Sequence, residues 1–124
     1  MTVLADSDIL IEVSRARDKT LMARWRELGE SENEVAYSPV SAAEVWAGAR
    51  TGEFDATTKL LDSLRCLPID SETGARAGRF MRKYRKSHSL ALGDALIAAA
   101  AVITGAALWT RNRKHFPMKE LSFF

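Results

Sequence analysis

Short apolar runs alternate with longer stretches of helical periodicity along the whole chain, and this order constrains the fold more than any other feature. The sequence predicts five strands, at residues 3–5, 35–37, 67–69, 107–109 and 121–123. Strands that alternate with helices favour an α/β fold with a mainly parallel, five-stranded sheet covered on both faces. Pro68 predicts an edge or end position for the third strand, because proline cannot donate to the sheet ladder.

The segments between the strands carry apolar residues at helical spacing. Helices are expected over residues 18–30, from residue 41 onward, over 54–64, from residue 71 onward and over 92–104. Ser41 and Glu44 have the spacing of a capping box, and Ser71 is expected to cap the following helix. The Ala-rich last helix is expected to be buried on most sides and to end at Gly105.

Length and composition fit one globular domain over residues 1–124, since the chain has 124 residues of which 47% are hydrophobic. The start lacks the pattern of a signal peptide, and no apolar stretch is long enough to span a bilayer comfortably. We therefore expect a cytoplasmic protein with no membrane association. Cys66 is the only cysteine, which excludes an internal disulfide and a thiolate metal site, and it is expected to be buried as a small hydrophobe.

Charge is distributed unevenly along the chain. Residues 1–64 hold 7 Lys/Arg and 12 Asp/Glu, whereas residues 65–124 hold 11 and 4, so net charges of −5 and +7 combine to the overall +2. Residues 76–86 carry six basic side chains and no acidic one. This segment is either a solvated helix face or a surface for an anionic polymer such as RNA.

Polar side chains follow the predicted strands, where open α/β sheets bind their ligands. Three carboxylates from distant parts of the chain, Asp6, Glu44 and Asp94, are expected to converge on one rim, where they would repel one another and raise each other's pKa. Mg²⁺ or Mn²⁺ resolves such repulsion, since these ions take oxygen ligands and bridge to phosphates. A bound ion of this kind can activate water for phosphodiester hydrolysis.

Each of these polar residues also has a purely structural interpretation. Glu44 can be the capping-box partner of Ser41, and Asp94 can complement a helix dipole. Asp8 is interpreted first as an N-terminal helix residue, while Thr110 and Asn112 can each cap a short turn. The set is more informative than any member, because all fall at the same end of the predicted sheet.

The segments VLADSDILIEV, SPVSAAEVWAGA, LPID and GDALIAAAAVITGAALWTRNRKHF together resemble a PIN-domain ribonuclease, most of all the VapC toxins of toxin–antitoxin pairs. The resemblance implies a PIN-like α/β/α sandwich and catalytic roles for Asp6, Glu44 and Asp94, with Asp6 and Asp94 as metal ligands. The resemblance also implies Asn112 as the fourth catalytic residue, at a position where many members carry Asp. The family further implies Mg²⁺- or Mn²⁺-dependent RNA cleavage, a homodimer and inhibition by a cognate antitoxin.

The remaining functional candidates are weaker. Thr110, Arg111 and Arg113 are possible substrate contacts, the two arginines through RNA phosphates. His115 is expected at a helix end or in a loop, and His88 to be exposed at the end of the basic helix. The grooves beside Trp46 and the helices over residues 18–30 and 54–64 are candidate antitoxin-docking surfaces.

Three other functions remain open from the sequence. The chain can be a housekeeping PIN nuclease of RNA processing, a PIN domain that binds RNA without cleaving it, or a receiver-like signalling domain that accepts a phosphoryl group on Asp70. The basic segment and Asp94, in its apolar setting, fit the last of these poorly.

Overall fold

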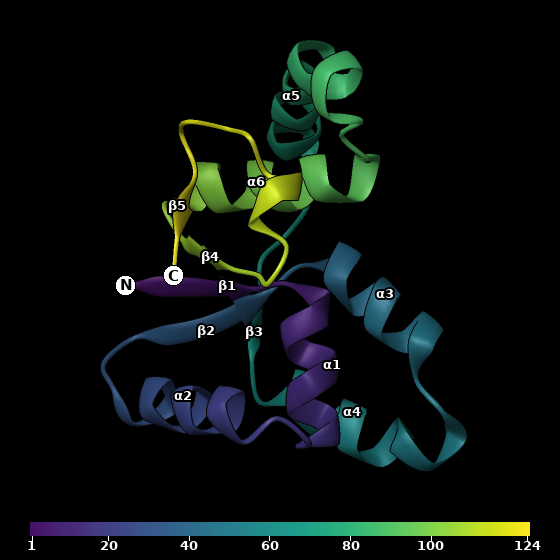
Figure 1. Cartoon of the computed structure of the whole chain (residues 1–124), viewed down its shortest axis with the longest axis vertical. Helices are drawn as coiled ribbons and strands as arrows, with labels where there is room; N and C mark the ends of the chain where they lie inside the picture. The colour runs from purple at the N-terminus through teal and green to yellow at the C-terminus, as the bar shows by residue number, and fades with distance from the viewer.

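A computed structural model describes all 124 residues and contains one five-stranded sheet (Figure 1). Its strands are β1 (Thr2–Ala5), β2 (Glu34–Tyr37), β3 (Arg65–Cys66), β4 (Ala107–Trp109) and β5 (Ser122–Phe123). Their spatial order is β3-β2-β1-β4-β5, and every neighbouring pair is parallel. The predicted parallel α/β/α sandwich is confirmed, as is the edge position of the third strand.

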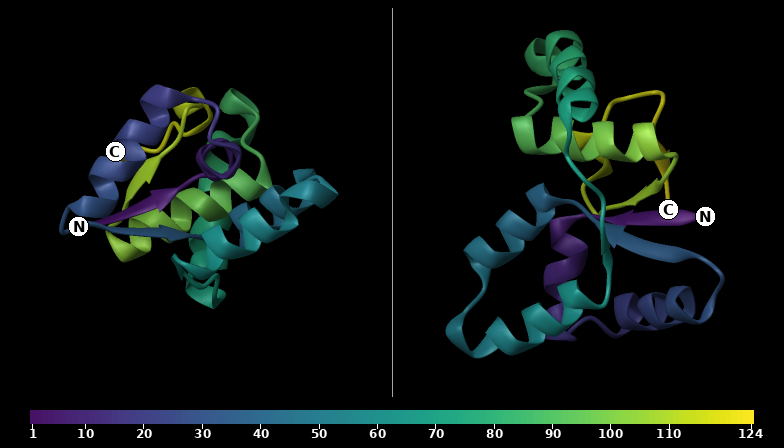
Figure 2. Two further views of the ribbon diagram at one scale, coloured as in Figure 1. Left: turned by 90° about the horizontal axis from the view of Figure 1, so that it is seen from below. Right: turned by 180° about the vertical axis from the view of Figure 1, so that it is seen from behind.

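Six α-helices connect the strands: α1 (Ser7–Arg15), α2 (Lys19–Glu30), α3 (Pro39–Gly48), α4 (Phe54–Asp62), α5 (Ser71–His88) and α6 (Leu92–Thr104). Two short 3₁₀ turns, Thr51–Glu53 and Arg113–His115, complete the chain. In Figures 1 and 2, α5 and α6 cover one face of the sheet, and α1, α2 and α4 cover the other. Helix α3 contacts both α1 and α6. None of the helices combines the length and apolar character that crossing a membrane requires.

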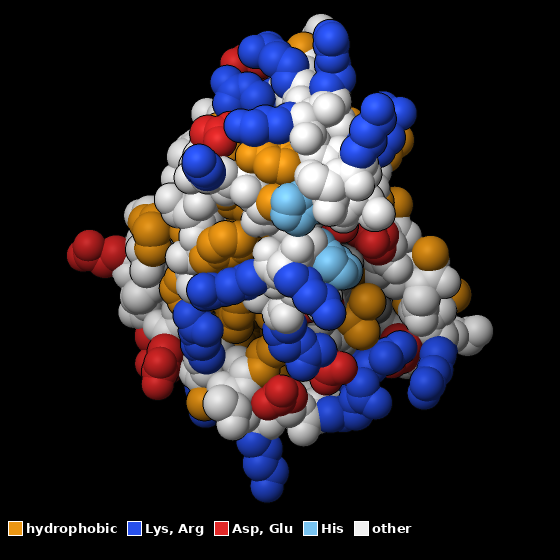
Figure 3. Space-filling model, turned by 45° about the horizontal axis from the view of Figure 1, so that its top comes forward, with side chains coloured by type: hydrophobic (Ala, Val, Ile, Leu, Met, Phe, Trp, Pro, Cys, Tyr) orange, Lys and Arg blue, Asp and Glu red, His pale blue; other side chains and the backbone are white.

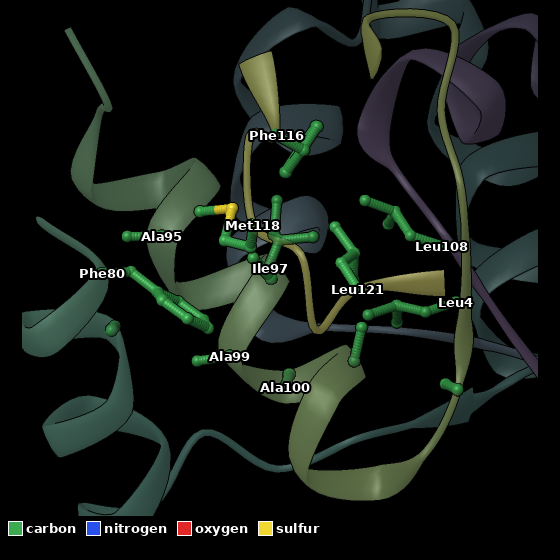
Figure 4. Close-up of a cluster of buried hydrophobic side chains, with 14 of the residues drawn as sticks. Leu4, Phe80, Ala95, Ile97, Ala99, Ala100, Leu108, Phe116, Met118 and Leu121 are labelled. Atoms are coloured by element: carbon green, nitrogen blue, oxygen red, sulfur yellow. The ribbon is translucent and has the colours of Figure 1, made fainter. Parts of the chain in front are cut away.

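The sheet separates two apolar cores. The central strand β1 is buried on both faces, because Leu4 points into the core under α5 and α6 while Val3 and Ala5 point into the core under α1, α2 and α4. Figure 4 shows the first core, in which Phe80 of α5 and Ile97 of α6 lie among the apolar side chains above the sheet. The burial of strand side chains on both faces explains why the strands read as continuous apolar runs.

Two helix starts differ from the predictions. Helix α3 begins at Pro39, and Ser38 is its cap, with its hydroxyl oxygen accepting from the Ser41 amide at 3.2 Å. Proline is favoured in the first turn because its φ is already helical, so the helix starts two residues before Ser41 of the expected capping box. Helix α5 is capped by Asp70 rather than Ser71, since the Asp70 carboxylate accepts from the Thr73 amide at 3.0 Å.

The third strand and Cys66 also differ from the predictions. The strand covers Arg65–Cys66 rather than residues 67–69, and pairing ends where the Leu67 amide donates to the Tyr37 carbonyl at 2.8 Å. Pro68 has no amide hydrogen to continue the ladder. Cys66 is exposed, not buried, and it lies on β3, the strand at the edge of the sheet.

Candidate active site

Asp6 occupies the centre of the candidate site, at the point where β1 ends and α1 begins. Its Oδ1 accepts from the Ser7 amide at 2.8 Å and caps α1, while its Oδ2 accepts from the Thr110 hydroxyl at 2.9 Å. The Asp6 amide donates to the Trp109 carbonyl at 2.9 Å across the β1–β4 pair. The Asp6 side chain is therefore held from two neighbouring strands, and the residue is only 6% exposed.

Glu44 from α3 and Asp94 from the first turn of α6 interact electrostatically with Asp6. Burial raises the pKa of Asp6, hydrogen bonds from Ser7 and Thr110 oppose this, and the charges of Asp8 and Asp94 add to the rise. Desolvation also raises the pKa of Glu44, and the charges of Asp6 and Asp94 raise it further. The structure thus brings the three predicted carboxylates to one rim of the sheet, close enough to repel one another.

Asp8 organises the segment that follows β4. It lies in the first turn of α1, as predicted, and its Oδ2 accepts from the Arg111 amide at 3.0 Å and from the Asn112 side-chain amide at 3.3 Å. The Asn112 backbone amide donates to the Thr110 hydroxyl oxygen at 3.0 Å. The side chain of Asn112 therefore lies beside Asp8 rather than in contact with Asp6. This pairing was not predicted from the sequence, which placed both residues at the same end of the sheet but gave no strand order.

The two arginines of this segment have protein partners. The Arg111 guanidinium lies 3.7 to 3.8 Å from the carboxylates of Asp8, Glu12 and Asp18. The Arg113 guanidinium donates to the Phe124 carbonyl at 3.0 Å and packs over the ring of Phe123. Both side chains remain exposed and accessible to an RNA phosphate. The predicted phosphate contacts of Arg111 and Arg113 stay predictions.

A cleft of about 250 Å³ opens beside Asp94. It is lined by His88, Ser89, Leu90, Ala91, Asp94 and His115, so both histidines of the chain border it. His115 ends a 3₁₀ turn, as expected, and its Nδ1 lies 3.7 Å from Asp94 Oδ2. Burial raises the pKa of Asp94, and nearby His115 opposes that rise. Figure 3 shows both histidines, in pale blue, next to acidic side chains on one face.

The donor set of the rim suits a hard cation. No three His, Cys, Asp or Glu side chains form a ready-made metal site. The pKa values of the rim carboxylates are nevertheless raised, first by burial and then by neighbouring carboxylate charges, and a cation would relieve both effects. The ligand atoms that the rim offers are carboxylate oxygens, which Mg²⁺ and Mn²⁺ prefer. Both ions retain bound waters and therefore need few protein ligands. Asp6 and Asp94 therefore fit a metal completed by water and substrate.

Asp70 does not belong to this site. It follows the edge strand β3, and its Oδ1 accepts from both the amide and the hydroxyl of Thr73. These hydrogen bonds lower the pKa of Asp70. Asp70 therefore acts as a helix cap. No acidic cluster surrounds it that would serve the phospho-accepting chemistry of a receiver domain.

Comparisons with known proteins agree with this geometry. The PIN-domain family model matches residues 3–121. Ribonuclease VapC10 of Mycobacterium tuberculosis is 40% identical over 119 residues, which cover 95% of this chain and 88% of that protein. The structure also superposes on VapBC2 from Rickettsia felis bound to a promoter DNA fragment (TM-score 0.84, 19% identity, 100% and 98% of the two chains). A toxin–antitoxin complex from Klebsiella pneumoniae gives a TM-score of 0.76 at 25% identity over 96% and 94% of the chains.

Proposed function

The chain belongs to the PIN-domain family and to its VapC ribonucleases, and from this premise we propose that it is a Mg²⁺- or Mn²⁺-dependent endoribonuclease toxin whose catalytic residues are Asp6, Glu44 and Asp94. The observation that carries the site assignment is that burial raises the pKa of all three carboxylates, that the charge of Asp94 further raises the pKa of Asp6, and that the charges of Asp6 and Asp94 further raise the pKa of Glu44. The three carboxylates come from three elements far apart in sequence, and a charge cluster of this kind is unfavourable without a cation. The same membership sets aside the receiver-like alternative.

The proposed roles of the site residues follow from how deeply each side chain is buried. Asp6 is buried and fixed by two hydrogen bonds, so it is suited to hold the metal in one position, with Asp94 as the second ligand. Each Asp6 oxygen retains a free lone pair after these hydrogen bonds. Glu44 is more exposed, and its raised pKa suits a group that accepts a proton from an attacking water. Asn112 supports the site through Asp8, at the fourth position of the family motif.

In the reaction, water adds to the phosphorus of an RNA phosphodiester and one P–O bond breaks. The metal supplies, when bound, a Lewis acid that neutralises the phosphate and the oxygen that leaves. Asp6 and Asp94 would hold the ion, Glu44 would take the proton of the attacking water, and the oxygen that leaves would be protonated by solvent. His88 and His115 border the cleft into which the RNA strand next to the cut would enter.

Thr110 is expected to position Asp6 rather than to contact substrate. It is buried, and its hydroxyl both donates to Asp6 and accepts from the Asn112 amide. Thr110→Val removes the hydroxyl at nearly constant volume, and we expect a 10- to 100-fold loss of metal affinity or activity, in the range of other ligand-supporting residues. Thr110→Ser keeps the hydroxyl and should retain most activity. Metal titrations of both variants check this, and equal metal affinity for Val and Ser would contradict the positioning role.

The surface has two apolar regions. Trp46 and Phe54 pack edge to face with ring centroids 5.9 Å apart, although they are 40% and 44% exposed. A separate open groove of about 520 Å³ between α3 and α6 is bordered by Val40, Leu92 and Leu96. We propose that the protein is a homodimer and that the antitoxin docks beside Trp46. The α3–α6 groove is also bordered by Glu44, so we assign it to the active site rather than to the dimer contact. The apolar stripes of α2 and α4 contribute little to docking, because their main residues are buried in the core.

Expression of the active protein alone in a bacterial host is expected to arrest growth, and co-expression of the cognate antitoxin is expected to restore it. A negatively charged rim is inhibited most effectively by an arginine, whose planar guanidinium binds two carboxylate oxygens and stays protonated. The measurement is growth with and without the product of the adjacent gene, together with co-purification. The control is the Asp94→Asn variant, which should bind the partner without arresting growth. Normal growth with the active enzyme and no stable partner would favour the housekeeping nuclease.

A further inference from the structure

Helix α5 carries a row of cations that have no acidic partners. Its six basic residues are Arg76, Arg79, Arg82, Lys83, Arg85 and Lys86, and none forms an ion pair within the chain. All are exposed except Arg76, which is half-buried. The opposite side of α5 packs into the core through Ala77, Phe80 and Tyr84, so the cations lie on the outer side. Figure 3 shows Lys and Arg side chains gathered at the end of the molecule where α5 lies.

Helix stability alone does not account for this row. Cations near a helix C-terminus favour the macrodipole, but the effect is confined to the last turn. That explanation covers Arg85 and Lys86, whereas Arg79 and Arg82 lie in the middle of the helix. Like charges three or four residues apart destabilise a helix, as at Arg79 and Lys83. The row of cations therefore destabilises the helix, and an anionic partner outside the chain would offset this repulsion.

The opposite side of the active site is electrically balanced. There Arg17 pairs with Glu12 at 2.9 Å, and Arg111 lies among carboxylates of α1 and its flank. Cations and carboxylates on that side satisfy each other within the protein. An anionic polymer that reaches Asp94 meets unpaired cations along α5 and, on a shorter stretch, at Arg113 and Lys114 in the turn that carries His115.

Helix α5 leads directly into the active-site cleft. Its last residue, His88, and the following Ser89 line the cleft that contains Asp94. The Ser87 hydroxyl lies 2.7 Å from His88 Nδ1, so this nitrogen is engaged and Nε2 faces away from it. The cationic row and the carboxylate rim are therefore two parts of one continuous surface.

We propose that the outer side of α5 is a phosphate track that binds the RNA backbone flanking the cut site, so that RNA crosses the C-terminal end of α5 as it leaves the cleft. The inference rests on the proposed ribonuclease function and adds the path of the substrate. The stretch from Arg76 to Lys86 is about 15 Å long at 1.5 Å per residue. A track of this length spans several successive phosphates of an RNA strand. Contacts of this kind position the substrate without reading its sequence.

The test compares two triple substitutions that change net charge equally. The first, Arg79→Gln with Arg82→Gln and Lys83→Gln, removes the middle of the track. The second, Lys19→Gln with Arg26→Gln and Lys59→Gln, removes three exposed cations on α2 and α4 that also lack ion pairs. Both are made in the Asp94→Asn background, so that RNA binding is measured without cleavage. The probe is a fluorescent RNA hairpin with a single-stranded tail, followed by anisotropy over a range of salt concentrations.

The α5 variant is expected to bind the hairpin about tenfold more weakly at moderate salt, with the slope of log K against log salt lowered by about two, since each lost phosphate contact contributes about 0.7. The control variant should keep the parent affinity and slope. Equal loss in both variants would show a general charge effect and overturn the track, as would unchanged binding of the α5 variant. The molecular mass of each variant in solution is measured as well, and an unchanged mass excludes a change of oligomeric state as the cause of altered binding. If the triple variant does not fold, Arg79→Gln and Lys83→Gln alone should each lower the slope by about 0.7.

Failure of the ribonuclease proposal would be visible separately. If the Asp94-containing protein cleaves no RNA but the slopes differ as stated, the phosphate track stands and the catalytic proposal fails. If cleavage proceeds and the α5 variant cleaves with unchanged KM, the track is wrong while the catalytic proposal stands. If the α5 cations bind RNA, the α5 variant should have a raised KM and an unchanged kcat, because these cations lie outside the reacting groups.

Discussion

Replacing Asp94 with asparagine is expected to reduce RNA cleavage by more than about a hundredfold while the protein remains folded. Removal of groups that only support metal ligands costs 10- to 100-fold, so loss of a ligand itself should exceed that range. Asparagine has nearly the same shape and fits the first turn of α6, where no hydrogen bond depends on the carboxylate charge. Cleavage of labelled RNA with Mg²⁺ or Mn²⁺ present, together with a thermal melt, measures both parts of the expectation.

Asp6→Asn is expected to have a similar effect on cleavage but a less simple effect on stability. The asparagine oxygen can still cap α1, whereas its amide nitrogen would replace the acceptor that the Thr110 hydroxyl uses. The matched control is Glu120→Gln, an exposed acidic residue in the turn before β5. Full cleavage by both Asp6→Asn and Asp94→Asn would remove the assignment of the active site to this rim.

Chelation of divalent ions is expected to abolish cleavage, and Mg²⁺ or Mn²⁺ is expected to restore it. The rim offers carboxylate oxygens, which are hard ligands, and the chain has no cysteine cluster that would favour Zn²⁺. The measurement is the initial cleavage rate in excess chelator, followed by addition of each ion in turn. Undiminished cleavage in excess chelator would rule out the metal-dependent mechanism.

Metal binding should also appear as a change in stability, independently of activity. The folded-state pKa values of Asp6, Glu44 and Asp94 are raised, so the metal-free fold binds more protons than the unfolded chain in the window above the ordinary values of 3.8 and 4.5. Stability of the metal-free protein should therefore fall as pH rises through that window. At neutral pH, Mg²⁺ or Mn²⁺ should raise the Tm of the wild type.

The Asp94→Asn variant supplies the control for this stability effect. In chelator at neutral pH its Tm should exceed that of the wild type, because one desolvated charge is gone. Added metal should then raise its Tm by less than it raises that of the wild type. Equal metal-induced shifts in the two proteins would mean that the ion binds elsewhere.

The fold could be predicted from the sequence because its signals are local and repeated. The strands β1, β2 and β4 are buried on two faces. Each is therefore an apolar run that can be recognised in the sequence without knowing which strands it pairs with. Helix α6 matches its predicted bounds for the same reason, and Gly105 ends it with a φ of +73°. A helix start at Asp8 was expected but the extent of α1 was not predicted, because its apolar residues directly follow those of β1 and its start depends on the Asp6 cap.

The sequence by itself determined the parallel α/β order, three of the acidic residues of the rim and the cationic segment of α5. Only the tertiary structure decided what these groups contact: the Thr110 hydroxyl on Asp6, Asn112 beside Asp8, and His115 beside Asp94. The physical reason is that residues 6 and 110 are brought together by the pairing of β1 with β4, a contact between distant parts of the chain. Whether a charge stays unpaired, as on α5, or is neutralised, as at Arg111, likewise depends on neighbours that folding supplies.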